Sequence, residues 1–192
     1  MKISIVIPVY DKMKNGDFFL ERCLDSIKSQ TYTDYEIIMT HEGNSPHNTN
    51  LGMKQAKGDL IKILHQDDYL TDETVLQGIA TIMDVTDKKW LIQGSSNNLI
   101  PVYTGDIHLG NNKLGSPSAL TIRNGLDMYF DEELVWLFDC DFYKRMYDKY
   151  GEPFIQRHNR ITIGEGEHQA THLIANTEKE KEVFLMRQRY VR

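Results

Sequence analysis

The chain has 192 residues and a formal net charge of −6, with 40% hydrophobic and 26% charged residues. This balance predicts one soluble globular domain with a substantial core, and the acidic charge argues against nucleic acid, whose phosphates require a basic face. No apolar run approaches the roughly 20 residues that cross a bilayer, and the N-terminus lacks the features of a signal peptide. We therefore expect a cytoplasmic protein in which Cys23 and Cys140 are reduced core thiols.

The first half of the chain alternates short apolar runs with segments of helical periodicity. The runs "KISIVIPVY", "YEIIM" and "DLIKILH" are rich in β-branched residues and predict strands that are buried on both faces. Helical spacing of apolar residues predicts helices over 18–30, 50–57 (closed by Gly58) and 71–83 (with Thr71 as N-cap). Strands and helices in alternation predict a parallel sheet with right-handed crossovers, which "WLIQGSS" continues from Trp90.

After Ser95 the pattern changes to shorter elements. "LIPVYTGDI" and "ALTIR" predict short strands on either side of a polar loop, and 141–150 predicts a helix that ends at Gly151. "FIQRHNRITIG" predicts a hairpin, and the charged segment 178–192 a final helix with a solvated face. We therefore divide one domain, 1–192, into a nucleotide-binding-like half (1–95) and a mixed half (96–192).

The carboxyl ends of the first three strands are followed by polar residues. Open parallel sheets bind ligands at this edge, so 8–11, 41–45 and 65–68 are expected to meet in one crevice. The adjacent carboxylates Asp67 and Asp68 can hold Mg²⁺ or Mn²⁺, which in turn can bridge a diphosphate. Alternatively, the pair caps the helix that begins near Thr71. Without a glycine-rich phosphate loop, metal and side chains would have to hold any phosphate.

Four blocks in order, "ISIVIPVYDK", "FLERCLDSIKSQTYTDYEII", "NLGMKQAKGDLIKILHQDDYL" and "WLFDCDFYKRMYDKYG", resemble the family 2 glycosyltransferases. The resemblance covers roughly residues 3 to 150. It implies the α/β GT-A fold, with a mostly parallel central sheet flanked by helices and a mixed C-terminal acceptor half. It also implies a nucleotide-diphosphate sugar donor, Mn²⁺ or Mg²⁺ as cofactor, and inversion at the anomeric carbon.

The resemblance assigns the donor side residue by residue. It places Pro8, Val9 and Tyr10 in the nucleotide pocket and gives Asp67 a metal-binding role. The family's two Asp after the second strand correspond to His41 and Glu42, and Glu42 keeps a carboxylate at the base-contacting position. In the metal motif, "HQDD", His65 replaces the Asp that normally meets the ribose side. The common Arg before Asn50 is Thr49 here.

The acceptor side follows from the fourth block. Asp139 lies six residues before Arg145, the family's spacing for the general base, which takes the acceptor hydroxyl's proton. Asp141 is the competing candidate for the base, and if it is not the base we expect it to contact the acceptor. The alternative for Asp139 is that it merely caps its helix. "GSPSALTIR" resembles the segment that leads to the acceptor and offers Ser116 and Ser118 as contacts.

The histidine-rich segment "HQATH" spaces His168 and His172 like the zinc ligands of HExxH proteases. Gln169 stands where the catalytic Glu of such a protease would be, which argues against proteolysis. We expect His168 to contact the metal or the diphosphate, with an ordinary surface turn as the alternative. The tail helix could also support a homodimer or a peripheral membrane contact.

The sequence thus favours an inverting, metal-dependent glycosyltransferase of polysaccharide biosynthesis that acts on a saccharide or lipid-linked acceptor. The alternative is a catalytically impaired GT-A module that binds nucleotide or saccharide without turnover, which His41 and His65 motivate. A nucleotidyltransferase fits less well, because "PVYDKMKNGD" lacks a glycine-rich basic loop.

Overall fold

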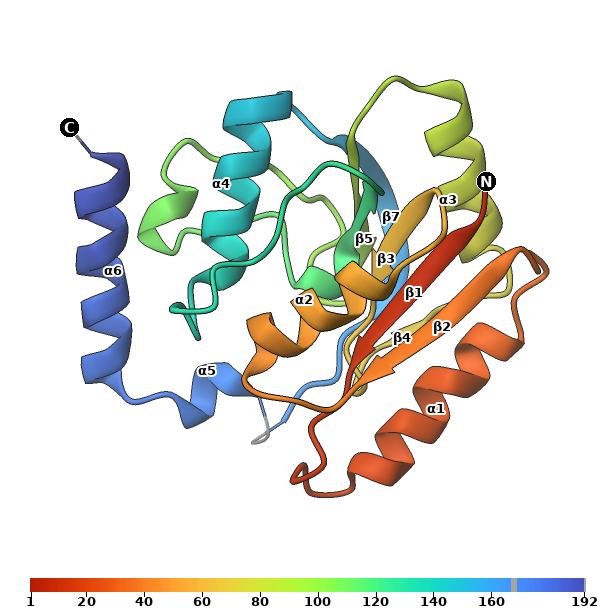
Figure 1. Ribbon diagram of the computed structural model, residues 1–192, viewed down its shortest axis with the longest axis horizontal. Helices are drawn as coiled ribbons and strands as arrows, with labels where there is room; N and C mark the ends of the chain where they lie inside the picture. The colour runs from red at the N-terminus through yellow and green to blue at the C-terminus, as the bar shows by residue number, and fades with distance from the viewer. Residues whose placement is uncertain (167–168, 192) are drawn as a thin grey trace.

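The computed structural model describes residues 1–166 and 169–191 and shows helices on both faces of one central sheet (Figure 1). Within the described residues the sheet has seven strands, in the order β2-β1-β3-β6-β5-β7-β4. They are β1 (Ile3–Pro8), β2 (Tyr35–Thr40), β3 (Leu60–Ile63), β4 (Tyr69–Leu70), β5 (Trp90–Ser95), β6 (Leu120–Arg123) and β7 (Phe154–Thr162).

The strands run mostly in one direction. β1 pairs in parallel with β2 and β3, β5 pairs in parallel with β7, and β6 joins the two groups by antiparallel pairing on both sides. The short β4 is antiparallel to β7 at the sheet edge. The predicted α/β class with a mostly parallel sheet is therefore confirmed, and β6 and β4 are the strands that run antiparallel to their neighbours.

Two hydrophobic cores lie on opposite faces of the sheet, because successive strand side chains point to opposite sides. On β1, Val6 belongs to one core and Ile5 and Ile7 to the other. The Val6 core is covered by α2 (Ser45–Gln55), α4 (Phe138–Tyr150) and α6 (Asn176–Tyr190), and the other core by α1 (Gly16–Lys28) and α3 (Val75–Val85). The short elements are η1 (Ile107–Leu109), η2 (Pro117–Ala119) and α5 (Ala170–Leu173).

Two helices begin elsewhere than the apolar periodicity predicts. α2 starts at Ser45 rather than at residue 50, because the Asn44 side chain accepts from the His47 amide and Pro46 occupies the first turn. α3 starts at Val75 rather than at residue 71. The Asp72 carboxylate accepts from the Thr74 amide at 2.9 Å and holds the preceding turn. A cap at Asn44 and a turn held by Asp72, not apolar spacing, set the two starts.

Two predicted β elements are wrong. Residues 154–164 do not form a hairpin: β7 is one strand, which pairs with β5 as far as Ile161, with irregularities at Gly94, and with β4 on its other side at Ile161 and Thr162. Residues 99–107 contain no strand but form a loop in which the Val102 amide donates to the Lys113 carbonyl at 2.8 Å. Pro101 has no amide hydrogen for a ladder, which disfavours a strand there.

The C-terminal tail forms the predicted helix, α6, but it is more than a solvated face. Glu182 and Met186 are buried against the rest of the chain, while Phe184 is 64% exposed. Cys23 and Cys140 are free and buried, as predicted. Within the described residues, no helix combines the length and the apolar character needed to span a membrane.

The contact between α2 and β1 at Gly52 gives a stability prediction. A Cβ atom at Gly52 would lie 2.4 Å from Cγ1 of Val6, so Gly52→Ala is expected to lower the free energy of unfolding by about 1–3 kcal/mol. The matched control is Gly78 in α3, where a Cβ would meet only Nε2 of Gln156 at 3.6 Å. Gly78→Ala is expected to be neutral or to stabilise by up to about 1 kcal/mol. Urea unfolding measures both, and equal midpoints would contradict this packing.

Candidate active site

The carboxyl ends of β1, β2 and β3 open onto one pocket of about 290 Å³. The structure brings together the predicted donor-side residues Pro8, Val9, Tyr10, His65 and Asp67 in its wall. The remaining lining residues are Met13, Gly43, Asn44, Ser45, Asn48, Gln66, Phe138, Gln169 and Leu173. This convergence is what an open parallel sheet produces, because its strand ends meet at one edge.

Asn48 fixes the loops around this pocket and was not anticipated from the sequence. Its buried side chain donates to the Val9 carbonyl at 2.9 Å and accepts from the Glu42 amide at 3.1 Å. The loops after β1 and β2 are thereby held together. The Glu42 side chain is exposed, next to the lining residue Gly43, so its predicted contact with a base stays a prediction.

His65, Asp67 and Asp68 place possible metal-ligand atoms within 4.8 Å of one another. Nε2 of His65 is buried and has no hydrogen-bond partner among the described residues. Burial lowers the pKa of His65, which favours the neutral imidazole that ligates metals. One imidazole and two carboxylates suit Mn²⁺, whereas Mg²⁺ would use the carboxylate oxygens alone, so the residues present fit the expected ion.

The two carboxylates differ in their surroundings. Asp68 is 2% exposed, and its Oδ1 accepts from the Gly164 amide at 2.8 Å. Burial and the neighbouring Asp67 raise the pKa of Asp68. The Asp67 carbonyl accepts from Arg22 of α1 at 2.6 Å, and a Cβ at Gly164 would lie 2.4 Å from that carbonyl. Only glycine permits so close an approach of the segment after β7. His168, a predicted metal contact, lies outside the described residues.

A second pocket, of about 310 Å³, adjoins the first and shares His65, Asp67, Phe138 and Gln169 with it. Asp139 lines this second pocket, together with Asp68 and Ser116. The other lining residues are Asn97, Gly110, Asn112, Pro117, Val135, Trp136, Leu137, Cys140, Ile163 and Gly164. The possible metal ligands and the predicted base therefore belong to one continuous crevice.

Asp139 lies in the first turn of α4, which begins at Phe138 and so three residues before the predicted start. Its carboxylate accepts from the Cys140 amide at 2.7 Å and from the Asn112 side chain at 2.8 Å. Burial raises the pKa of Asp139 to about 6, although both hydrogen bonds lower it. A carboxylate with such a pKa is ionised at neutral pH and still basic enough to take a proton.

The N-terminus of α4 is capped from α6, a contact that sequence reasoning missed. The carboxylate of Glu182 accepts from the amides of Val135, Trp136 and Leu137, at 2.8 to 3.3 Å. These amides precede the helix and have no intrahelical partners. In the sequence, Glu182 is one of several acidic residues in a charged run, and nothing there marks it. Its burial, which the structure shows, distinguishes it from the other acidic residues of the run.

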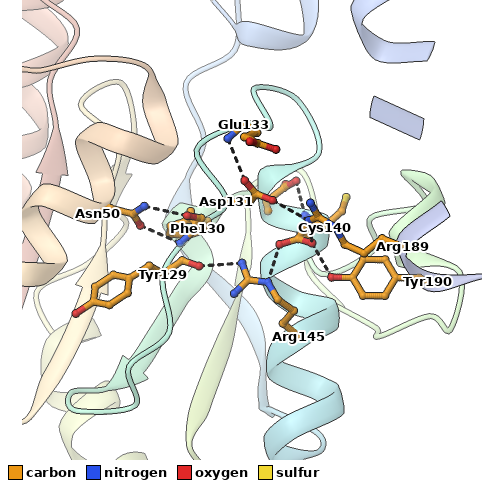
Figure 2. Close-up of polar contacts among 11 residues, drawn as sticks. Asn50, Tyr129, Phe130, Asp131, Glu133, Cys140, Arg145, Arg189 and Tyr190 are labelled. Carbon is orange, nitrogen blue, oxygen red and sulfur yellow. Dashed lines mark hydrogen bonds and ion pairs between the residues drawn. The ribbon is translucent and has the colours of Figure 1, made fainter. Parts of the chain in front are cut away.

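Two predicted acceptor contacts do not reach the crevice. Asp141 is fully buried on another side of α4, where its carboxylate binds Arg145, Arg189 and Tyr190 at 2.6 to 2.8 Å. Figure 2 labels these three partners. Ser118 is also fully buried, and its hydroxyl accepts from the His65 amide at 2.8 Å. The polar atoms of both residues already make these hydrogen bonds inside the protein. The two residues therefore support the structure of the site and do not face the crevice. Of the three predicted contacts, Ser116 alone lines the pocket.

No family model matches the chain. The chain is 35% identical over 65 residues to the uncharacterized glycosyltransferase EpsJ of Bacillus subtilis, a match that covers 33% of this chain and 18% of EpsJ. The solved structure of Staphylococcus aureus TarS with UDP-GlcNAc superposes with a TM-score of 0.72 at 20% identity, over 97% of this chain and 65% of that one. The mannosyltransferase PcManGT of Pyrobaculum calidifontis, solved with GDP-Man and Mn²⁺, gives 0.63 at 11% identity, over 99% and 70%.

The chain thus spans less than a fifth of EpsJ and about two thirds of the solved TarS chain. The sequence match is to a glycosyltransferase. The structural neighbours, one solved with UDP-GlcNAc and the other a mannosyltransferase solved with GDP-Man, share the architecture of this chain. The resemblance seen in the four sequence blocks is confirmed, and the chain has the GT-A fold and is related to the glycosyltransferases.

Proposed function

We propose that this protein is an inverting, metal-dependent glycosyltransferase that moves a sugar from a nucleotide-diphosphate donor to an acceptor hydroxyl. The observation that carries the proposal is the shared crevice, in which Asp139 and the group His65, Asp67 and Asp68 line the same pocket. An inverting transfer needs these two features, a site for the donor diphosphate and a carboxylate that can receive the proton of the acceptor. Residues 1–95 then supply most of the donor side and 96–192 the acceptor side.

On the donor side, Pro8, Val9 and Tyr10 line the pocket that would receive the nucleoside, and Glu42, which precedes the lining residue Gly43, would contact the base. His65 and Asp67, with Asp68 behind them, would hold a divalent cation, which when bound neutralises the charge of the leaving diphosphate. His168 is proposed as a further contact. The structures of TarS with UDP-GlcNAc and of PcManGT with GDP-Man and Mn²⁺ support such a donor for a chain of this fold.

On the acceptor side, Asp139 would accept the hydroxyl proton as the acceptor oxygen forms a bond to the anomeric carbon. The bond from that carbon to the diphosphate breaks at the same time, and its electron pair leaves with the diphosphate. Phe138 and Leu137, both less than 10% exposed, flank the carboxylate and limit water around it. Attack from the side opposite the diphosphate inverts the anomeric configuration.

The acceptor itself is proposed to be a saccharide or a lipid-linked saccharide, as in the making of a polysaccharide. Ser116 offers a hydroxyl to it, and Trp136 offers an apolar ring in the same wall. The exposed Phe184 and Leu185 of α6 are candidates for contact with a second copy or with a membrane surface. We place this chemistry in the cytoplasm, where the two buried thiols would stay reduced.

Loss of the metal-binding carboxylate gives the first test. Asp67→Ala is expected to abolish the Mn²⁺-dependent rise in melting temperature that UDP or GDP produces, because the diphosphate loses its bridge to the protein. Asp25→Ala on the exposed face of α1, where Asp25 pairs with Lys28 at 3.0 Å, is the control. Asp68→Asn should be milder, since Asp68 is buried behind Asp67. A full shift with Asp67→Ala would refute the metal assignment.

The general base gives the second test. Asp139→Asn keeps the shape of the side chain but cannot take a proton, so sugar transfer should fall by ~10²-fold or more with near-native folding and donor affinity. Because burial raises the pKa of Asp139 to about 6, wild-type transfer should decline as the pH falls through that value. Asp148→Asn, at the exposed end of the same helix, is the control.

Assays of transfer and donor hydrolysis over a panel of nucleotide sugars with Mn²⁺ provide the readout. Undiminished transfer by Asp139→Asn would exclude it as the base. A wild-type protein that binds nucleotide with Mn²⁺ but turns over no donor would instead establish the binding-module alternative.

A further inference from the structure

The side chain of Asn112 lies between the predicted base and the loop that forms the acceptor wall. Its Nδ2 donates to Oδ2 of Asp139 at 2.8 Å and to the Gly115 carbonyl at 3.1 Å. Its Oδ1 accepts from the amides of Leu114 at 2.9 Å and Gly115 at 3.0 Å. All four hydrogen-bonding positions of the amide are therefore used.

This network fixes the orientation of the Asn112 amide. If the amide were rotated by half a turn, its NH₂ group would face the backbone amides of Leu114 and Gly115, which are donors themselves. The carbonyl oxygen would then face the carboxylate of Asp139. The backbone thus requires that the NH₂ group, and not the oxygen, points toward Asp139.

The same loop is held to α4 at a second point. The Tyr143 hydroxyl, one turn after Asp139, lies 3.2 Å from the carbonyls of both Gly115 and Ser116. Gly115 has φ +104°, a conformation that side-chain-bearing residues rarely adopt, so the turn depends on glycine. Ser116, which lines the acceptor pocket, is therefore fixed relative to Asp139 through Asn112 and Tyr143.

We propose that Asn112 is the positioning residue of this transferase, holding Asp139 ionised and aimed at the acceptor while it fixes the loop that carries Ser116. The inference rests on the proposed function, in which Asp139 is the base. The hydrogen bond occupies Oδ2 and the Cys140 amide contacts Oδ1, so rotation of the carboxylate is restricted from both sides. Asn112 does not receive the proton itself, because an amide is not a base at neutral pH.

Asn112→Asp tests the donated hydrogen bond with the least change in shape. The new carboxylate can still accept from the amides of Leu114 and Gly115, but it faces Asp139 with an oxygen instead of an NH₂ group. The loss of a hydrogen bond to a charged group is expected to move the acid limb of the pH profile for transfer upward by about one to two pH units. Because the pKa of Asp139 is about 6, a shift of this size should lower transfer at pH 7 by about 2- to 10-fold, with donor affinity unchanged.

Asn111→Asp is the matched control. Asn111 is the preceding residue, is exposed, and donates to Asp106 at 2.8 Å, so the variant makes the same change of charge beside another carboxylate. It should leave the acid limb of the profile in place. Asn112→Ser is the second variant, because serine can support the turn but is too short to reach Asp139. It should also shift the limb upward.

A measurement without substrate separates this inference from the proposed function. The raised pKa of Asp139 means that its protonated form stabilises the fold at low pH, and that this contribution is lost as the pH rises through about 6. The stability difference between wild type and Asp139→Asn therefore reports that pKa. When both proteins also carry Asn112→Ser, the change in this stability difference should occur at a higher pH. The Asp139 carboxylate has then lost its hydrogen-bond donor, so its pKa is higher.

The other titratable groups around Asp139 are common to all these proteins. Cys140 and Tyr143 face it from α4, and His65, Asp67 and Asp68 share its pocket. Because these groups are present in every protein compared, their effects on the pKa of Asp139 cancel in each comparison. An Asn112 variant whose acid limb and stability difference both match the wild type would overturn the proposal. If the wild-type protein transfers no sugar, the proposed function and the catalytic part of this inference are both wrong. The stability difference would still decide whether Asn112 holds Asp139 ionised.

Discussion

A carboxylate that is fully removed from water must be neutralised, and Asp141 meets this requirement through α6. Its two oxygens accept from Arg145 of its own helix and from Arg189 and Tyr190 of α6. Arg189 also pairs with Asp131 at 2.8 Å, so two acidic and two basic side chains balance one another (Figure 2). Removal of one partner would leave an uncompensated buried charge, which typically costs ~3–5 kcal/mol. α4 and α6 are thereby held together.

This constraint decides where the carboxylate of Asp139, the proposed base, points. Asp139 lies two residues before Asp141, so the two side chains leave the helix on different sides, and anchoring Asp141 inside turns Asp139 toward the crevice. Glu182 of α6 caps the start of the same helix. The C-terminal helix, which reads in the sequence as a charged surface element, thus fixes α4 at its first turn and at its buried face.

The same network reaches the donor side through the loop before α4. Arg145 donates to the Tyr129 carbonyl at 2.8 Å, and the Asn50 side chain of α2 pairs with both backbone groups of Phe130 at 2.8 and 2.9 Å. His47, in the first turn of α2, lies 2.7 Å from Glu132. Because the start of α2 also lines the donor pocket, one loop connects the two sides of the crevice. The two walls of the crevice are therefore held at a fixed separation.

The sequence predicts those features that follow from local periodicity and strand order. The apolar runs around Val6 and Ile61 give a parallel sheet, and its strand ends bring Tyr10, His65 and Asp67 together. What it does not predict depends on contacts between distant residues: Glu182 reaching the start of α4, Asn112 facing Asp139, and Asn48 joining two loops. Asn and Glu are ordinary surface residues, so no local pattern marks those that are buried and bonded.

The central claim is that a divalent cation and a donor diphosphate bind at His65 and Asp67, in the crevice that Asp139 faces. Anomalous diffraction at the manganese edge, from crystals of the wild-type protein grown with UDP and Mn²⁺, tests this claim most directly. We expect a peak within coordinating distance of Asp67, with the diphosphate beside it and the Asp139 carboxylate across the pocket. Bound UDP with manganese elsewhere, or UDP held away from this crevice, would contradict it.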